Sequence, residues 1–203
     1  MEDVSRRSLF RIIAATGAGS FIIPPAVAQH VHASLAEAKS LSGGPAYQPK
    51  CFTSHHFATL KKLADMIIPA DEHSAGASEA GAAEFIDLLS SRNPELAAVF
   101  NGGMTWLDET MHRRYNADFI KSSAEQQKAI LDSLAWSKNV TPETAYGVRF
   151  WTSLRNMVVD AFYTSPVGVR DLGYMGNTVV SKFQVPDEAV QYVMKRSPLA
   201  DAS

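Results

Sequence analysis

Apolar side chains recur at the spacing of an α-helix along most of residues 53–163, and this pattern limits the possible folds more than any other feature. The first stripe follows Thr53 and comprises Phe57, Leu60, Ala64, Ile67 and Ile68. Similar stripes follow Ser78, Pro94, Ser122, Thr141 and Pro186. Apart from Val179-Val180, no segment shows the alternation typical of a strand. The sequence therefore predicts an all-α fold, a small bundle of about five to six helices that ends in an irregular loop and tail.

Local signals predict where several of these helices begin and end. Thr53 is a capping residue ahead of the first stripe, and Pro69 follows its end. Asn93-Pro94 combines a cap with a proline at the first helical position. The segment 122–125, Ser-Ser-Ala-Glu, matches a capping box. These signals place the helices within one domain, which we expect to span residues 51–203.

Two segments lack a helical pattern. Residues 29–50 are rich in Ala, Ser, Gly and Pro, and this composition predicts a flexible linker. Residues 168–177 contain three glycines and are expected to form an irregular loop. Leu172, Tyr174 and Met175 in this loop have no helical period to turn them inward, so they are candidates for a partner interface. The alternative is a loop that folds back over its own bundle.

The first 28 residues resemble an export signal. Arg6 and Arg7 are adjacent and precede a short, weakly apolar run from residue 12 to residue 23. This arrangement predicts a twin-arginine signal, which directs folded proteins to the periplasm. The small residues Ala26 and Ala28 suit a signal peptidase, which would leave Gln29 as the new N-terminus. A general secretory signal and an uncleaved anchor are the alternatives, although a spanning helix needs about 20 apolar residues.

Composition excludes several classes of protein. The formal net charge is −2 and no basic stripe is present, so the sequence argues against nucleic-acid binding. The single cysteine, Cys51, excludes an internal disulfide bond. It is either a free thiol or a bridge to another chain, and its place ahead of the first helix makes it a second candidate for the partner interface.

The search for an active site yields few candidates. The sequence has no glycine-rich dinucleotide turn, phosphate loop, nucleophile elbow or Cys-x-x-Cys pair. Asp71, Glu72 and His73 could ligate a metal, although three consecutive residues rarely converge on one ion. A free-standing periplasmic binding protein or metal-dependent enzyme using this loop is therefore the alternative function. Otherwise we expect no catalytic, cofactor-binding or metal-binding residue in this chain.

Several motifs resemble the gluconate 2-dehydrogenase subunit 3 family. They are Ile-Ile-Pro-Ala-Asp-Glu-His at residues 67–73, Ala-Gly-Ala-Ala-Glu-Phe-Ile-Asp at 80–87, Gly-Met-Thr-Trp-Leu-Asp at 103–108, and the stretch 162–177. The resemblance implies a small accessory subunit of a periplasmic dehydrogenase. Its partner would be a large flavoprotein of the glucose–methanol–choline type, which would bind FAD and oxidise a sugar or sugar acid.

The same resemblance implies further partners and a task. Electrons would pass from the large subunit to a cytochrome c subunit or another acceptor. The small subunit would support maturation of the large one and would lend it a signal for the twin-arginine translocase. Its association with the membrane would come only through the complex.

Overall fold

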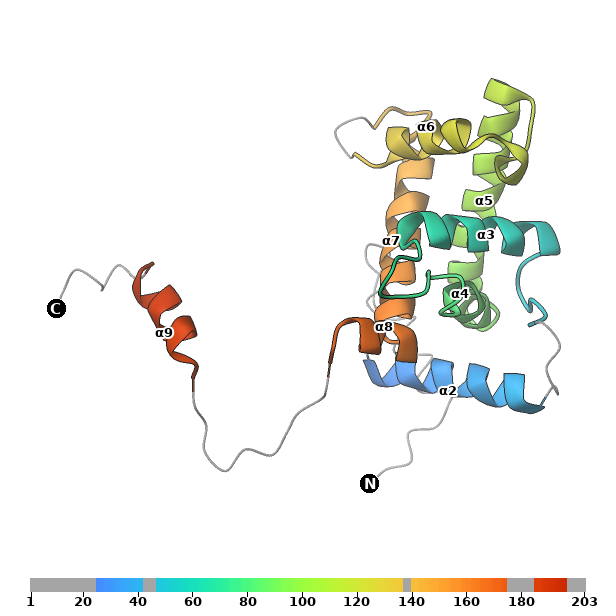
Figure 1. The fold of residues 1–203 in the computed structure, drawn as a ribbon. Coiled ribbons are helices and arrows are strands. Elements are labelled where there is room, and N and C mark those ends of the chain that lie inside the picture. The colour runs from blue at the N-terminus through green and yellow to red at the C-terminus, as the bar shows by residue number, and fades with distance from the viewer. Residues whose placement is uncertain (1–24, 42–46, 137–139, 175–184, 197–203) are drawn as a thin grey trace. The chain divides into compact units, whose positions relative to one another are not determined.

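The computed structural model describes residues 25–41, 47–136, 140–174 and 185–196. Within these residues it contains α-helices, one short 3-10 helix and no strand, so the predicted all-α fold is confirmed (Figure 1). The elements are α2 (Pro25–Leu41), α3 (Ser54–Ile67), α4 (Ala82–Ser90), α5 (Pro94–Tyr115), η1 (Phe119–Lys121), α6 (Ala124–Leu134), α7 (Ala145–Tyr163), α8 (Pro166–Asp171) and α9 (Asp187–Met194).

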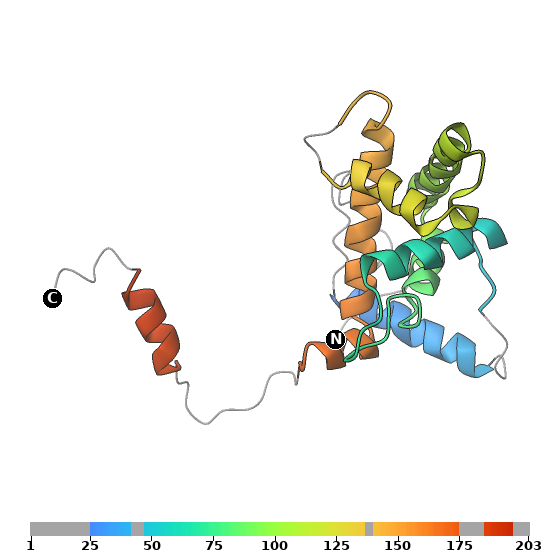
Figure 2. The same cartoon turned by 45° about the horizontal axis from the view of Figure 1, so that its top comes forward.

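The chain divides after Gly173 into two units. The first contains α2 to α8, and the second, which begins at Tyr174, contains α9. Within the first unit, α5 and α7 run alongside each other, while α6, α3 and α2 lie at successive levels along α7 (Figures 1 and 2). None of the helices in the described part of the chain has the length and apolar character needed to cross a bilayer.

Helix α4 is the centre of the first unit. It contacts α2, α3, α5 and α7, and each of its nine residues is buried. The apolar stripe that follows Ser78 comprises Ala82, Phe85, Ile86 and Leu89, which all lie in the core. Most of its residues are apolar, as a helix enclosed by its neighbours requires, and its buried carboxylates Glu84 and Asp87 have partners in the chain.

Small residues set the closest approach of α5 and α7. A Cβ atom added to Gly103 would lie 2.0 Å from Phe150 Cδ2, and one added to Gly147 would lie 2.2 Å from the Trp106 ring. Each helix therefore supplies a glycine against which the other packs an aromatic ring. The glycines are retained for packing, since a larger side chain at either position would separate the helices.

Two of the three predicted caps are present. The Thr53 side chain accepts a hydrogen bond from His56 N, and Asn93 accepts one from Leu96 N. The capping box lies one residue later than predicted, because Ser123 and Gln126 exchange the two bonds. Ser122 instead donates its hydroxyl to the Asp118 carbonyl at 2.9 Å.

The prediction of a flexible linker over residues 29–50 is wrong for residues 29–41, which belong to α2. Four apolar side chains of α2 are buried at helical spacing and pack in the main core: Val27, Ala28, Val31 and Leu35. Alanine-rich sequence favours helix, and the contact with α4 supplies the burial that a short isolated helix lacks.

The expected irregular loop over residues 168–177 begins later than predicted. Ser165 caps the short helix α8 by accepting a hydrogen bond from Gly168 N, and the helix continues to Asp171. Gly168 is buried, and no larger residue fits there because an added Cβ would lie 2.2 Å from the Phe162 carbonyl oxygen. The glycine therefore permits a tight corner between α7 and α8.

Candidate functional site

A fully buried aspartate ties the segment before α3 to the core. Asp87, on α4, accepts hydrogen bonds from Tyr47 Oη at 2.8 Å and from the backbone nitrogens of Lys50, Cys51 and Phe52 at 2.7, 3.0 and 3.0 Å. Both carboxylate oxygens are used twice, which compensates for the burial of the charge. This arrangement fixes where the chain enters α3.

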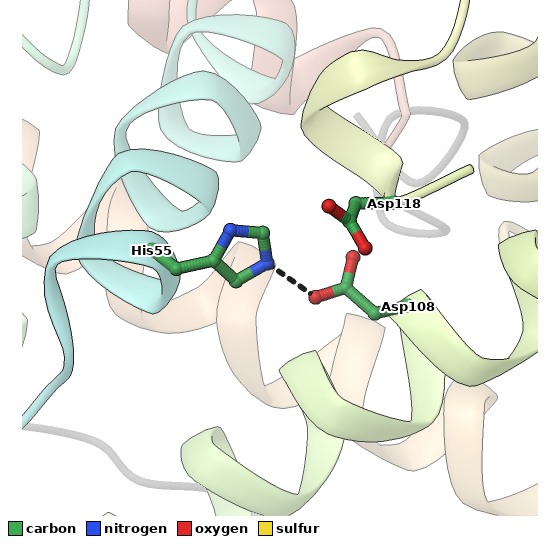
Figure 3. A group of neighbouring side chains, drawn as sticks. All are labelled: His55, Asp108 and Asp118. Atoms are coloured by element: carbon green, nitrogen blue, oxygen red, sulfur yellow. Dashed lines mark hydrogen bonds and ion pairs between the residues drawn. The ribbon is translucent and has the colours of Figure 1, made fainter.

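A second cluster joins three elements near the start of α3 (Figure 3). His55 Nε2 lies 2.6 Å from Asp108 Oδ2, and single ligand atoms of His55, Asp108 and Asp118 all lie within 4.8 Å of one another. His55 comes from α3, Asp108 from α5, and Asp118 precedes η1. One imidazole and two carboxylates are donors that a divalent cation such as Zn²⁺ accepts.

The carboxylates of this cluster already have partners within the chain. Asp108 Oδ1 accepts a hydrogen bond from Phe119 N at 2.8 Å. Asp118 contacts Lys121 Nζ at 2.5 Å and His112 Nε2 at 3.5 Å. The Lys121 ammonium lowers the pKa of the Asp118 carboxyl, first through their hydrogen bond. We therefore interpret the cluster as a clamp between α3, α5 and η1.

The loop predicted as an alternative metal site has a different arrangement. Asp71 Oδ1 accepts hydrogen bonds from the backbone nitrogens of His73 and Ser74, both at 2.8 Å, so this carboxylate closes a turn. These backbone hydrogen bonds lower the pKa of Asp71. Glu72 and His73 are highly exposed and pair with each other at 3.3 Å. Within the described residues, only the His55 cluster brings together three potential metal ligands.

Cys51 is half-buried against the core, with its thiol near Asn101 of α5. Asn101 Nδ2 lies 3.9 Å from its Sγ, and Asn101 Oδ1 lies 3.0 Å from His56 Nδ1. Burial, followed by the nearby Asp87 charge, raises the pKa of the Cys51 thiol. A thiol that stays protonated reacts slowly with a disulfide. The bridge to another chain stays a prediction.

The C-terminal candidates for a partner interface are exposed where they are described. Leu172 is 61% exposed and Tyr174 is 63% exposed. Met175 lies outside the described residues. Leu172 and Tyr174 are therefore large side chains that remain in contact with water in the described structure.

Helix α9, in the second unit, also carries exposed apolar side chains. None of its residues is buried, although Val190, Val193 and Met194 lie on one helical face. Tyr192 is also exposed, and the Arg196 guanidinium lies 3.8 Å from the centroid of its ring. Isolated helices of eight residues are marginal in water, so α9 is expected to need a surface to pack on.

The three tryptophans occupy different environments. Trp151 is buried and Trp106 packs against Gly147, which agrees with a role in the core. Trp136 is 62% exposed and lies beyond the end of α6.

The residues of the predicted export signal are described only in part. Arg6 and Arg7 lie outside the described residues. Ala26, Ala28 and Gln29 lie in the first two turns of α2, where Ala28 has no exposed surface.

The family model for gluconate 2-dehydrogenase subunit 3 matches residues 54–181, which is more than half of the chain. The chain belongs to this family. The match runs from the first residue of α3 past the end of α8, so it covers the His55 cluster and Asp87. Searches of curated proteins and of solved structures found no match.

The family motifs contain two aspartates whose hydrogen-bonding roles were not predicted from the sequence. Asp87 closes the motif at 80–87 and accepts backbone hydrogen bonds from the distant segment before α3, and Asp108 closes the motif at 103–108 and accepts one from Phe119. The sequence did contain a signal for Asp87. This aspartate lies within a continuous apolar run, where an unpaired carboxylate would be costly, and its position therefore predicts a buried carboxylate that accepts hydrogen bonds.

Proposed function

We propose that this chain is the non-catalytic small subunit of a periplasmic flavin-dependent dehydrogenase, and that it supports maturation and twin-arginine export of the large subunit. Membership of the gluconate 2-dehydrogenase subunit 3 family carries the proposal. The large subunit would be of the glucose–methanol–choline type, would hold FAD and would oxidise a sugar or sugar acid. A cytochrome c subunit or another acceptor would take the electrons.

The export role is supported by the leader. Arg6-Arg7 followed by a short, weakly apolar run favours a route that carries folded proteins. A protein that must receive FAD before export needs such a route. A large subunit without a signal of its own could then cross the membrane while bound to this chain.

The docking role is supported by the exposed apolar side chains near the C-terminus. Leu172 and Tyr174, together with the apolar face of α9, remain exposed after the chain has folded. Aromatic and apolar side chains of this kind are typical of the centre of a protein interface. We assign these exposed side chains, those of each unit taken separately, to contacts with the large subunit.

The proposal is tested by isolating the tagged chain from the periplasm and identifying the large flavoprotein that we expect to co-purify with it. We expect a complex with flavin absorbance and sugar-dependent dye reduction, and neither property in the isolated chain. Arg6→Lys with Arg7→Lys should retain both proteins in the cytoplasm. Export of both proteins at the normal level in this variant would contradict the twin-arginine role.

The docking surface is tested in the same complex. Val190→Asp with Val193→Asp should reduce recovery of the large subunit, while the melting temperature of the small subunit should stay unchanged because neither side chain is buried. Gln191→Asp adds a charge to the same helix at an exposed polar position and is the matched control. Equal recovery with the double variant and the control would exclude α9 as a docking element.

A further inference from the structure

The predicted cleavage site for signal peptidase lies inside a packed helix. Helix α2 begins at Pro25, so the small residues Ala26 and Ala28 belong to its first turns. Val27 is 4% exposed and Ala28 is not exposed at all. Val31 and Leu35 continue the same buried face.

Contacts further along α2 hold this helix on the first unit. The helix packs against α4, and the ring of His32 lies 4.8 Å from the ring of Phe85, centroid to centroid. His32 Nε2 lies 3.0 Å from Thr164 Oγ1, just after the end of α7. The Thr164 hydroxyl also donates to the Asp160 carbonyl near the end of α7.

Cleavage after Ala28 needs a different conformation. The reaction hydrolyses the peptide bond between Ala28 and Gln29, consuming one water and leaving a carboxylate on Ala28 and an amino group on Gln29. An endopeptidase requires several residues around this bond to be extended and accessible. The first turns of α2 would have to unwind, and Val27 and Ala28 would have to leave the core.

We infer that folding of α2 onto α4 protects the bond after Ala28, so that the exported protein keeps the whole of α2. The inference rests on the proposed function, because the twin-arginine route delivers a folded chain, whereas a general secretory route would deliver an unfolded one. The Ala-Val-Ala sequence then serves helix packing, and the exported chain does not begin at Gln29.

The test uses the purified full-length chain and purified signal peptidase in detergent, with intact mass as the measurement. A peptide of residues 15–40 should be cut after Ala28. The folded chain should be cut at least about tenfold more slowly, because cleavage requires the rare open form of α2. Equal rates for the chain and the peptide, or a peptide that is not cut after Ala28, would overturn the inference.

Two matched variants separate protection by α2 from an intrinsically poor substrate. Val31→Asp places a charge on the buried face outside the predicted site, and the chain should then be cut near the rate of a peptide with the same change. Ala33→Asp places the same charge on the exposed face and should leave the protection intact. A melting curve checks that the rest of the Val31→Asp variant stays folded. If the folded variant is still cut as slowly as the unmodified chain, the inference is overturned.

The same mass measurement is then made on the chain recovered from the periplasm. A chain that retains Pro25 and all later residues supports the inference, and a chain that begins at Gln29 overturns it. Failure of the proposed function would appear elsewhere, as normal export of the double arginine variant or as loss of the flavoprotein partner. The rates measured with purified components depend on neither result.

Discussion

Replacement of Asp87 by Asn should destabilise the protein strongly, although the two side chains have nearly the same shape. The carboxylate accepts four hydrogen bonds, with Oδ2 serving Tyr47 and Lys50 and Oδ1 serving Cys51 and Phe52. In the variant the amide nitrogen is best placed at the Oδ2 position, since the Tyr47 hydroxyl can turn and become the acceptor. The Lys50 amide then faces another donor and loses its partner.

The size of the effect follows from these losses. A hydrogen bond to a charged group contributes about 1.5–3 kcal/mol and a neutral one about 1 kcal/mol. One bond is lost and the two at Oδ1 weaken, while the variant no longer buries a charge, which offsets part of the loss. We expect a decrease of about 2–4 kcal/mol in the free energy of unfolding, or roughly 5–15 °C in melting temperature.

Urea unfolding of the purified chain measures this decrease, and Tyr47→Phe is the control. The control removes one hydrogen bond but leaves all three backbone bonds, so it should cost only about 1–2 kcal/mol. Burial, followed by the hydrogen bond to Asp87, raises the pKa of Tyr47, so its hydroxyl remains a donor at any physiological pH. If Asp87→Asn costs less than Tyr47→Phe, the carboxylate does not anchor the segment as described.

Two further predictions concern the helix contacts. Gly103→Ala should lower the free energy of unfolding by about 1–3 kcal/mol, because the new Cβ would overlap the Phe150 ring. The control Gly102→Ala should cost much less, because its Cβ meets only the movable Tyr146 hydroxyl. Equal costs of the two variants in urea unfolding would contradict this prediction. Burial lowers the pKa of His32 from its ordinary 6.5, so the unfolded chain binds the proton first and stability should fall as the pH drops below that value. His32→Gln should lose this part of the pH dependence in unfolding curves recorded across that range, and an unchanged dependence would refute the assignment.

Helices whose signals are local could be predicted from the sequence. The Thr53 and Asn93 caps each act within three residues, and the apolar stripes of α3 and α5 follow directly from helical geometry. The capping box was misplaced by one residue because Ser122 and Ser123 are chemically equal candidates. Their different partners, Asp118 and Gln126, became apparent only in the folded chain.

The exposure of Leu172 and Tyr174 was easier to predict from the sequence than the burial of α2. Leu172 and Tyr174 have no helical stripe to join, and both are exposed as that absence suggested. The same reasoning failed for α2. Val27, Val31 and Leu35 recur at helical spacing in the sequence, but the many small residues around them hide this stripe.

The sequence by itself determined the all-α class, the family and the starts of α3 and α5, because apolar period, caps and motifs depend on residues close together in the chain. Only the tertiary structure decided the partners of Asp87, which lie 35–40 residues away, and the meeting of His55 with Asp108, 53 residues apart. It also decided that Ala28 is packed in a helix. Contacts at such separations depend on how complete helices pack, and no local pattern encodes that packing.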